Sequence, residues 1–152
     1  MWRKGGLRWR GDRGTLTLFV VLFTPVVVLL AGLLVDGGIA INARQRAADV
    51  AQQAARAGAN DLDVAALRSG RIELEVPGAC TVATAFVGKY TGIGAKPGPC
   101  TFVPVNGHPG IKVYARVTVH SQFLGLIGIG SFTQTSYGEA TPVCGITQGG
   151  QC

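Results

Sequence analysis

Residues 15–35 read TLTLFVVLFTPVVVLLAGLLV, a run of 21 residues without a formal charge. As an α-helix with a rise of about 1.5 Å per residue, the run is about 32 Å long, close to the roughly 30 Å hydrocarbon core of a bilayer. Asp36 follows at once, and a charge near the bilayer centre is costly, so this residue marks an interface. The run predicts a transmembrane helix over residues 15–35.

Basic residues gather before this run. Residues 1–14 contain Arg3, Lys4, Arg8, Arg10 and Arg13. Asp12 is their only acidic neighbour, so five minus one leaves +4 of the net +6 in this arm. The positive-inside rule places the arm in the cytoplasm and the chain after Asp36 outside.

A signal peptide or a nucleic-acid-binding arm would share some of these features. A cleaved signal peptide has the same basic-then-apolar order, but its apolar region is usually about 7–15 residues long. Nucleic-acid binding is not expected, because no basic stripe with interleaved aromatics continues beyond the N-terminus. A membrane anchor explains the charge distribution better.

Residues 36–60 predict an extracytoplasmic continuation of the helix. The stretch 39–59 lacks Pro and is rich in Ala, a strong helix former. Small side chains recur there every three or four positions, and such a seam lets another backbone approach closely. The seam packs either on the chain's own domain or against neighbouring copies or partner helices. It consists of Ile39, Ala43, Ala47, Ala51, Ala54 and Gly58.

The first part of the ectodomain, residues 61–152, mixes short elements. Residues 61–69 indicate a helical turn, and the alternation over 72–76 predicts a strand. Residues 80–90 predict a helix, with Val82, Phe86 and Tyr90 on one face. Residues 92–99 predict a loop.

The second part predicts a small antiparallel sheet. Strands are expected over 100–105 and 111–120, joined at 106–110 by an Asn-Gly turn. The odd-numbered residues of the second strand, from Ile111 to Val119, are apolar and share one face. The apolar loop 123–130 is expected to cover the sheet, with a membrane surface or a partner groove as alternatives. Residues 131–141 predict a last polar strand, which gives an α+β fold.

All four cysteines follow the apolar run: Cys80, Cys100, Cys144 and Cys152. An even number outside the cytoplasm fits two disulfides in an oxidising compartment. Of the three possible pairings, Cys80–Cys100 with Cys144–Cys152 is favoured, because each bond closes a local loop. A zinc site would need C-x2-4-C spacing and further ligands, so no metal is expected.

No catalytic constellation is visible. His108 sits beside a turn, His120 ends a strand, and the neighbouring carboxylates of Glu73 and Glu75 are typical of a solvated surface. The G-x-S-x-G, H-E-x-x-H and P-loop motifs are missing. The sequence predicts no enzymatic activity, no cofactor and no small-molecule substrate.

Four segments, in this order, resemble a known family: residues 13–15 (RGT), 35–38 (VDGG), 43–49 (ARQRAAD) and 54–59 (AARAGA). Roughly residues 11–60 resemble the TadE/TadG-like pilus assembly proteins of the tight-adherence (Tad/Flp) system, in their actinobacterial form. The resemblance implies a minor pilin-like or assembly protein, anchored in the cell membrane and carrying a pilin-like ectodomain. Its implied partners are a secretion ATPase, platform proteins, a major Flp pilin and copies of itself through the N-terminal helix.

The resemblance also implies a processing site. TadE-type members are cut after a Gly, with Glu at the fifth mature position. The matching glycine here is Gly14, and the fifth residue after it is Phe19. This departure favours the TadG-like members, which retain their anchor. The alternative is an anchored extracellular binding module with no pilus role, using the strand face of Tyr114 and Arg116 or the loop 123–129.

Overall fold

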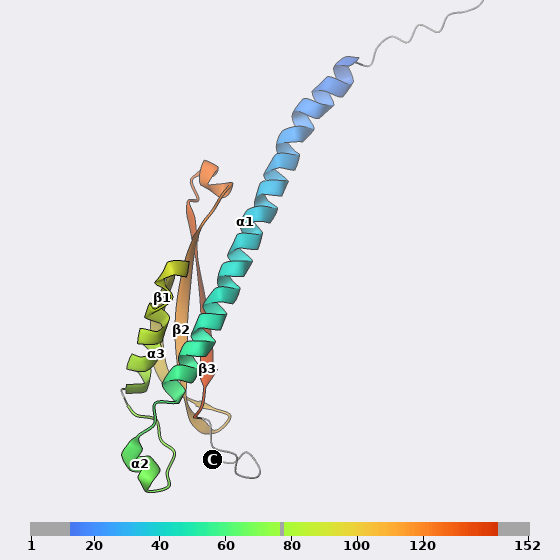
Figure 1. Ribbon diagram of the computed structural model, residues 1–152. Helices are drawn as coiled ribbons and strands as arrows, with labels where there is room; N and C mark the ends of the chain where they lie inside the picture. The colour runs from blue at the N-terminus through green and yellow to red at the C-terminus, as the bar shows by residue number, and fades with distance from the viewer. Residues whose placement is uncertain (1–12, 77, 143–152) are drawn as a thin grey trace, which may run out of the picture.

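The structure, a computed structural model, describes residues 13–76 and 78–142 and consists of one long helix with a small sheet beside its second half (Figure 1). This arrangement confirms the α+β prediction. The helices are α1 (Arg13–Ala59), α2 (Val64–Arg68) and α3 (Gly78–Gly88), with the short 3-10 helices η1 (Thr91–Ile93) and η2 (Leu124–Ile127). The strands are β1 (Ala95–Val105), β2 (His108–His120) and β3 (Ser131–Ala140).

Helix α1 is continuous over 47 residues, which corresponds to a length of about 70 Å. Its first half stands clear of the sheet, and its second half lies along the sheet (Figure 1). The helix therefore runs through both predicted segments, the apolar run and its Ala-rich continuation, without a break.

The sheet has the order β1-β2-β3, and both strand pairs are antiparallel. Val105 pairs with His108 across the two-residue turn Asn106–Gly107. Both turn residues have positive φ, 53° and 82°, as a type I′ hairpin requires. The predicted Asn-Gly turn is confirmed, and β2 begins directly after it.

One face of the sheet packs against α1 and α3 and forms the core. The apolar alternation of β2 supplies most of it, because Ile111, Val113, Ala115 and Val117 are all fully buried. Val119 is partly buried at the edge of this core. The predicted inward face of this strand is confirmed.

The strand predicted over residues 72–76 is wrong. Only an isolated bridge between Leu62 and Leu74 forms there. Its two flanking hydrogen bonds run from the Asp63 N–H to the Glu73 carbonyl and from the Glu75 N–H to the Asp61 carbonyl, each 3.0 Å long. The ladder cannot extend, because the pairing segment lies between the end of α1 and the start of α2.

Helix α3 is confirmed, but the face that it buries is a different one. Ala79, Ala83 and Val87 are buried, whereas Val82 is exposed. Small residues face the core because α3 passes close to α1: a Cβ on Gly58 would lie 2.5 Å from the Ala79 carbonyl oxygen. Large side chains on this face would push the two helices apart.

Strand β1 begins at Ala95, inside the region predicted as a loop. Its register shifts between Pro97 and Cys100, at a β-bulge. Pro cannot donate to a ladder and is tolerated at an edge strand or a bulge, and this strand provides both. Prolines and glycines are typical of loops, so the sequence predicted a loop where β1 begins.

Candidate functional site

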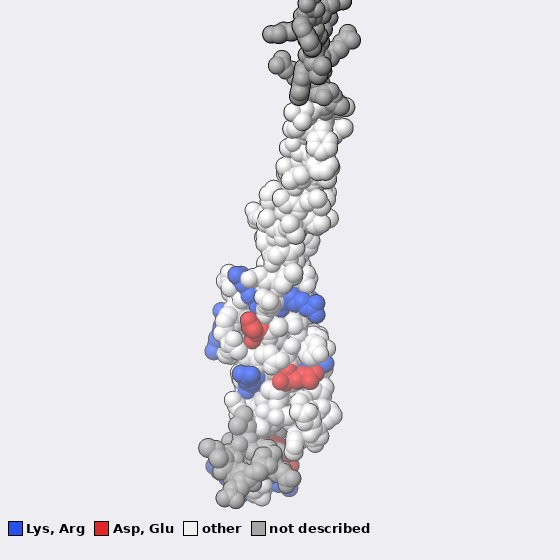
Figure 2. Space-filling model, turned by 90° about the vertical axis from the view of Figure 1, so that its right-hand side faces the viewer, with Lys and Arg blue, Asp and Glu red and all other residues white. Residues whose placement is uncertain are grey.

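The first half of α1 presents an apolar surface on all sides. From Leu16 to Val35 its large side chains are exposed, with Leu34 at 78%. Figure 2 shows this part of the helix without Lys, Arg, Asp or Glu atoms. The Thr24 hydroxyl donates to the Val20 carbonyl at 2.7 Å and so satisfies itself within the helix. The helix is long and apolar enough to be a candidate membrane span.

The second half of α1 uses its small-residue seam against the chain's own sheet and α3. Ala43, Ala47, Ala51 and Ala54 are at most 1% exposed, and Gly58 is buried as well. Gly138 of β3 matches the seam, because a Cβ there would lie 2.5 Å from the backbone of Ala51. In the structure the seam packs on the chain's own domain, the first of the two predicted partners. Ile39, at the upper end, is only partly buried.

Asp36 joins the two halves, and the sequence did not predict its role. Its side chain is 1% exposed, and the partners of its carboxylate are backbone groups. The carboxylate accepts three hydrogen bonds, from the N–H groups of Gln122 at 2.8 Å, Phe123 at 3.0 Å and Leu124 at 2.6 Å. We call this arrangement the Asp36 clasp. It ties α1 to the loop between β2 and β3, more than eighty residues away in the sequence.

The clasp favours the ionised carboxylate. Burial by itself would raise the pKa of Asp36, but the backbone hydrogen bonds from Leu124, Gln122 and Phe123 outweigh it, and the pKa lies below the usual 3.8. Hydrogen bonds to the charged form stabilise that form. Asp36 therefore holds the loop as an anion.

The clasped loop, residues 121–130, does not cover the sheet as predicted. It extends past the end of the sheet alongside the first half of α1 (Figure 1). Its turn is closed by the Ile129 N–H, which donates to the Leu124 carbonyl at 3.0 Å, and by Gly128, whose φ of 93° suits glycine. Its large apolar side chains point outward, so this loop adds apolar surface instead of hiding it. Those exposed are Phe123, Leu126, Ile127 and Ile129.

A disulfide between Cys80 and Cys100 connects α3 to β1. It is one of the two bonds of the favoured pairing. Cys144 and Cys152 lie outside the described residues, so their bond stays a prediction.

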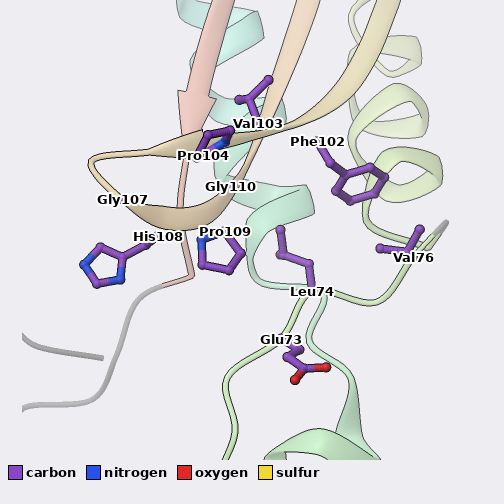
Figure 3. A pocket seen from close by; sticks show the side chains of 10 residues that line it. All are labelled: Glu73, Leu74, Val76, Phe102, Val103, Pro104, Gly107, His108, Pro109 and Gly110. Atoms are coloured by element: carbon purple, nitrogen blue, oxygen red, sulfur yellow. The ribbon is translucent and has the colours of Figure 1, made fainter.

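An apolar groove of about 520 Å³ lies at the far end of the sheet from the clasp (Figure 3). Leu74, Val76 and Phe102 line it together with the residues around the β1–β2 turn. The His108 ring and the Glu73 carboxylate point away from these apolar side chains (Figure 3). Binding sites for small molecules usually add convergent polar groups to an apolar pocket, and this groove offers none among its labelled side chains.

The open face of the sheet carries polar and aromatic side chains that pair with one another. The ammonium of Lys112 lies 2.9 Å from a Glu139 carboxylate oxygen and 4.0 Å from the Tyr137 ring centroid. The hydrogen bond to Glu139 raises the pKa of Lys112 above its usual value. Tyr114 stacks at an angle on Tyr137, with ring centroids 5.7 Å apart. These contacts explain the face as a set of cross-strand pairs.

The remaining candidates do not converge on a site. Glu73 pairs with Arg71 at 3.2 Å on the surface. Within residues 13–76 and 78–142, no group of three His, Cys, Asp or Glu side chains is placed to hold a metal ion. Gly14 lies in the first turn of α1, and the ring of Phe19 stacks on Phe23 four residues later, at 4.8 Å.

A comparison with protein families places this geometry in context. Residues 14–61 match the family model described as "Putative Flp pilus-assembly TadE/G-like". The match confirms the resemblance and covers α1 almost from end to end, including Asp36 and the seam. No curated protein and no solved structure matches the chain. The actinobacterial form of the resemblance stays a prediction.

Proposed function

We propose that this chain, whose residues 14–61 match the Flp pilus-assembly TadE/G-like family, is a non-enzymatic component of a Tad/Flp-type pilus or secretion apparatus. Its role is that of a minor pilin-like or assembly protein. The observation that carries the proposal is the position of the match on α1, the element that extends beyond the ectodomain. An element of this kind is free to meet other components of an apparatus.

The proposed location is the cell membrane. Residues 15–35 span the bilayer once, residues 1–14 lie in the cytoplasm, and residues 36–152 lie outside it. The exposed apolar surface from Leu16 to Val35 and the basic arm before it support this topology. The disulfide between Cys80 and Cys100 agrees with an oxidising compartment on the far side.

Partners are proposed to meet the first half of α1. The seam of the second half is used by the chain's own sheet, so copies or other Tad proteins cannot reach it without unfolding the ectodomain. The exposed residues of the first half, such as Leu22 and Leu29, are available within the membrane. Helices in a bilayer associate through packing, so a partner helix there needs no polar site.

An exchange of the membrane helix tests this role. In the native cells, residues 15–35 other than Gly32, on which Phe123 packs, are replaced by those of an unrelated apolar helix of equal length, which keeps the anchor but changes its surface. We expect the exchanged protein to reach the membrane in normal amounts and to fail to restore pili in a strain that lacks the wild-type chain. Full restoration of pili would mean that residues 15–35 act only as an anchor, and it would contradict the proposal.

Photo-cross-linking identifies the partner directly. A photoreactive amino acid at Leu22 or Leu29 is expected to give adducts with other Tad components or with a second copy. The control position is Leu67 in α2, which is exposed at the opposite end of the molecule. Adducts at Leu67 but none along α1 would favour the binding-module alternative.

The anchor is proposed to remain uncleaved at Gly14, because Phe19 occupies the position where TadE-type members have Glu. Mass spectrometry of the N-terminus of the mature protein tests this. A peptide that begins at Thr15 would show that Gly14 is a processing site.

A second candidate is an anchored extracellular binding module with no pilus role. The apolar groove lined by Leu74, Val76 and Phe102 favours it, because a groove of this size accepts an apolar side chain of another protein. Under this alternative, Phe102→Ser abolishes function while the exchanged membrane helix preserves it. Under the pilus proposal the two results are reversed.

A further inference from the structure

The loop of residues 121–130 exposes the most prominent apolar side chains of the ectodomain. Leu126 is 85% exposed and Ile127 67%, and both belong to η2. A soluble surface rarely gathers such residues in one short turn without a purpose. Their exposure calls for an apolar environment at this end of the molecule.

The loop lies at the level of the apolar half of α1. The clasp holds it at Asp36, and the side chain of Phe123 packs over Gly32, where an added Cβ would come within 2.8 Å of the Phe123 ring. Gly32 lies inside the predicted span, one helical turn before Asp36, which is about 6 Å along the helix axis. The exposed apolar side chains of the loop therefore lie beside the exposed apolar side chains of α1, and Phe123 connects the two at Gly32.

Several basic side chains of the ectodomain lie at the end that carries this loop, and many of its acidic side chains lie at the opposite end. The charged residues of α1 that follow Asp36 begin with Arg44 and Arg46, and Lys96 and Arg116 face each other across β1 and β2 at the same end. All four are exposed. Figure 2 shows Lys and Arg atoms where the uncharged helix meets the ectodomain. The acidic residues of the opposite end are Asp61, Asp63, Glu73 and Glu75, beside Arg68 and Arg71.

We propose that the loop 121–130 inserts into the outer leaflet beside α1, so that the ectodomain is attached to the membrane at two points. Leu126 and Ile127 enter the boundary between headgroups and acyl chains, a depth of about 5–10 Å for interfacial apolar segments. The basic residues at this end then face anionic headgroups, which attract Lys and Arg. This inference rests on the proposed membrane anchoring of α1.

The attachment has a consequence for assembly. A helix with a single anchor lets its ectodomain rotate about the helix axis and tilt. With the Asp36 clasp and the inserted loop, the ectodomain is held with α1 and the loop side by side in the bilayer. The orientation in which the ectodomain meets other components is then fixed before assembly.

Depth-dependent fluorescence quenching tests the insertion. The full chain is reconstituted into vesicles of phosphatidylcholine and phosphatidylglycerol, with lipids brominated near the headgroup end of their acyl chains. Trp2 and Trp9, the natural tryptophans, are first replaced by Phe. Three single-tryptophan variants are then compared: Leu126→Trp in the loop, Leu29→Trp in α1 and, as a control at the opposite end of the molecule, Leu67→Trp in α2.

We expect the fluorescence of Leu126→Trp and of Leu29→Trp to fall in brominated vesicles, and that of Leu67→Trp to stay unchanged. Leu126, Leu29 and Leu67 are all exposed, so a tryptophan at any of the three fits without disturbing the fold. If Leu29→Trp is quenched but Leu126→Trp behaves like Leu67→Trp, the loop meets water or a protein partner and the insertion is wrong. If Leu29→Trp is not quenched either, the anchoring of α1 and the proposed function fail with it.

Discussion

Asp36 accepts hydrogen bonds from three successive backbone N–H groups, which hold the start of the loop 121–130 against α1. Asp36→Asn keeps the shape but offers one acceptor oxygen instead of two and loses the charge. We expect the Asn variant to loosen the loop and Asp36→Ala to release it. The measurement is amide hydrogen exchange at Gln122, Phe123 and Leu124, which should accelerate in the order wild type, Asn, Ala. Asp49→Asn, on the exposed face of α1, serves as the control and should change nothing.

The same residue makes the loop sensitive to acid. Because the pKa of Asp36 is lower in the folded protein than its usual 3.8, the clasp contributes its full stability above that value. The contribution is lost as the pH falls through the lowered pKa. We therefore expect the difference in loop exchange between wild type and Asp36→Asn to persist at neutral pH and to shrink below pH 3.8. A difference that grows on acidification would contradict the ionised clasp.

Gly138 is a position at which a single methyl group matters. A Cβ there would meet the Ala51 backbone at 2.5 Å, and backbone cannot move aside as a flexible side chain can. Gly138→Ala is expected to lower the free energy of unfolding of the protein by about 1–3 kcal/mol, the usual cost of overpacking. Chemical denaturation followed by circular dichroism measures it. Gly130→Ala, with open space around its Cβ, is the control and should be close to neutral.

At the scale of elements, the Cys80–Cys100 disulfide cross-links α3 to β1. Cys80 and Cys100 are 20 residues apart, and a bond that closes a loop of this size typically contributes about 2–4 kcal/mol. The double variant Cys80→Ala/Cys100→Ala should melt at a clearly lower temperature than the oxidised wild type. Reduced wild type, in which the predicted Cys144–Cys152 bond is broken as well, should melt no higher than the variant.

The packing of α1 on the sheet explains why the second half of this helix is so rich in Ala. Ala43, Ala47 and Ala51 let the helix lie directly on the sheet, and Gly138 completes the contact from the other side. The sequence predicted the seam because a period of three to four is visible in one dimension. It could not identify the partner, because the strand that carries Gly138 lies far along the chain from the seam and looks polar.

At the scale of the whole molecule, the seam is unavailable to neighbours, and this is testable. Cysteine in place of Ala47 should react with a maleimide only after denaturation, whereas cysteine in place of Arg44, an exposed neighbour on the same helix, should react at once. Peptide mapping separates these sites from the natural cysteines. Rapid labelling at residue 47 in the native protein would mean that the seam is open to other proteins.

The described part of the molecule has an apolar end, the first half of α1. Basic side chains lie where this half meets the sheet: Arg44, Arg46, Lys96 and Arg116. Acidic side chains lie at the opposite end: Asp61, Asp63, Glu73 and Glu75. The sequence by itself determined the long helix, its membrane-like first half, the Asn-Gly hairpin and the inward face of β2. These are local patterns, in which the period of apolar residues or the backbone demands of a turn leave one solution. The resemblance of residues 14–61 to pilus assembly proteins also lay within one continuous segment.

Only the tertiary structure decided what the seam packs against, where the loop 121–130 lies and why Asp36 can be buried. In each case a residue of α1 meets a segment that is distant in sequence: Ala51 meets Gly138, Gly32 meets Phe123, and Asp36 meets the backbone of residues 122–124. Backbone N–H groups carry no sequence signal, so a carboxylate that they alone satisfy resembles an ordinary surface charge in the sequence. Folding gives that charge its partners and brings the loop alongside the apolar helix.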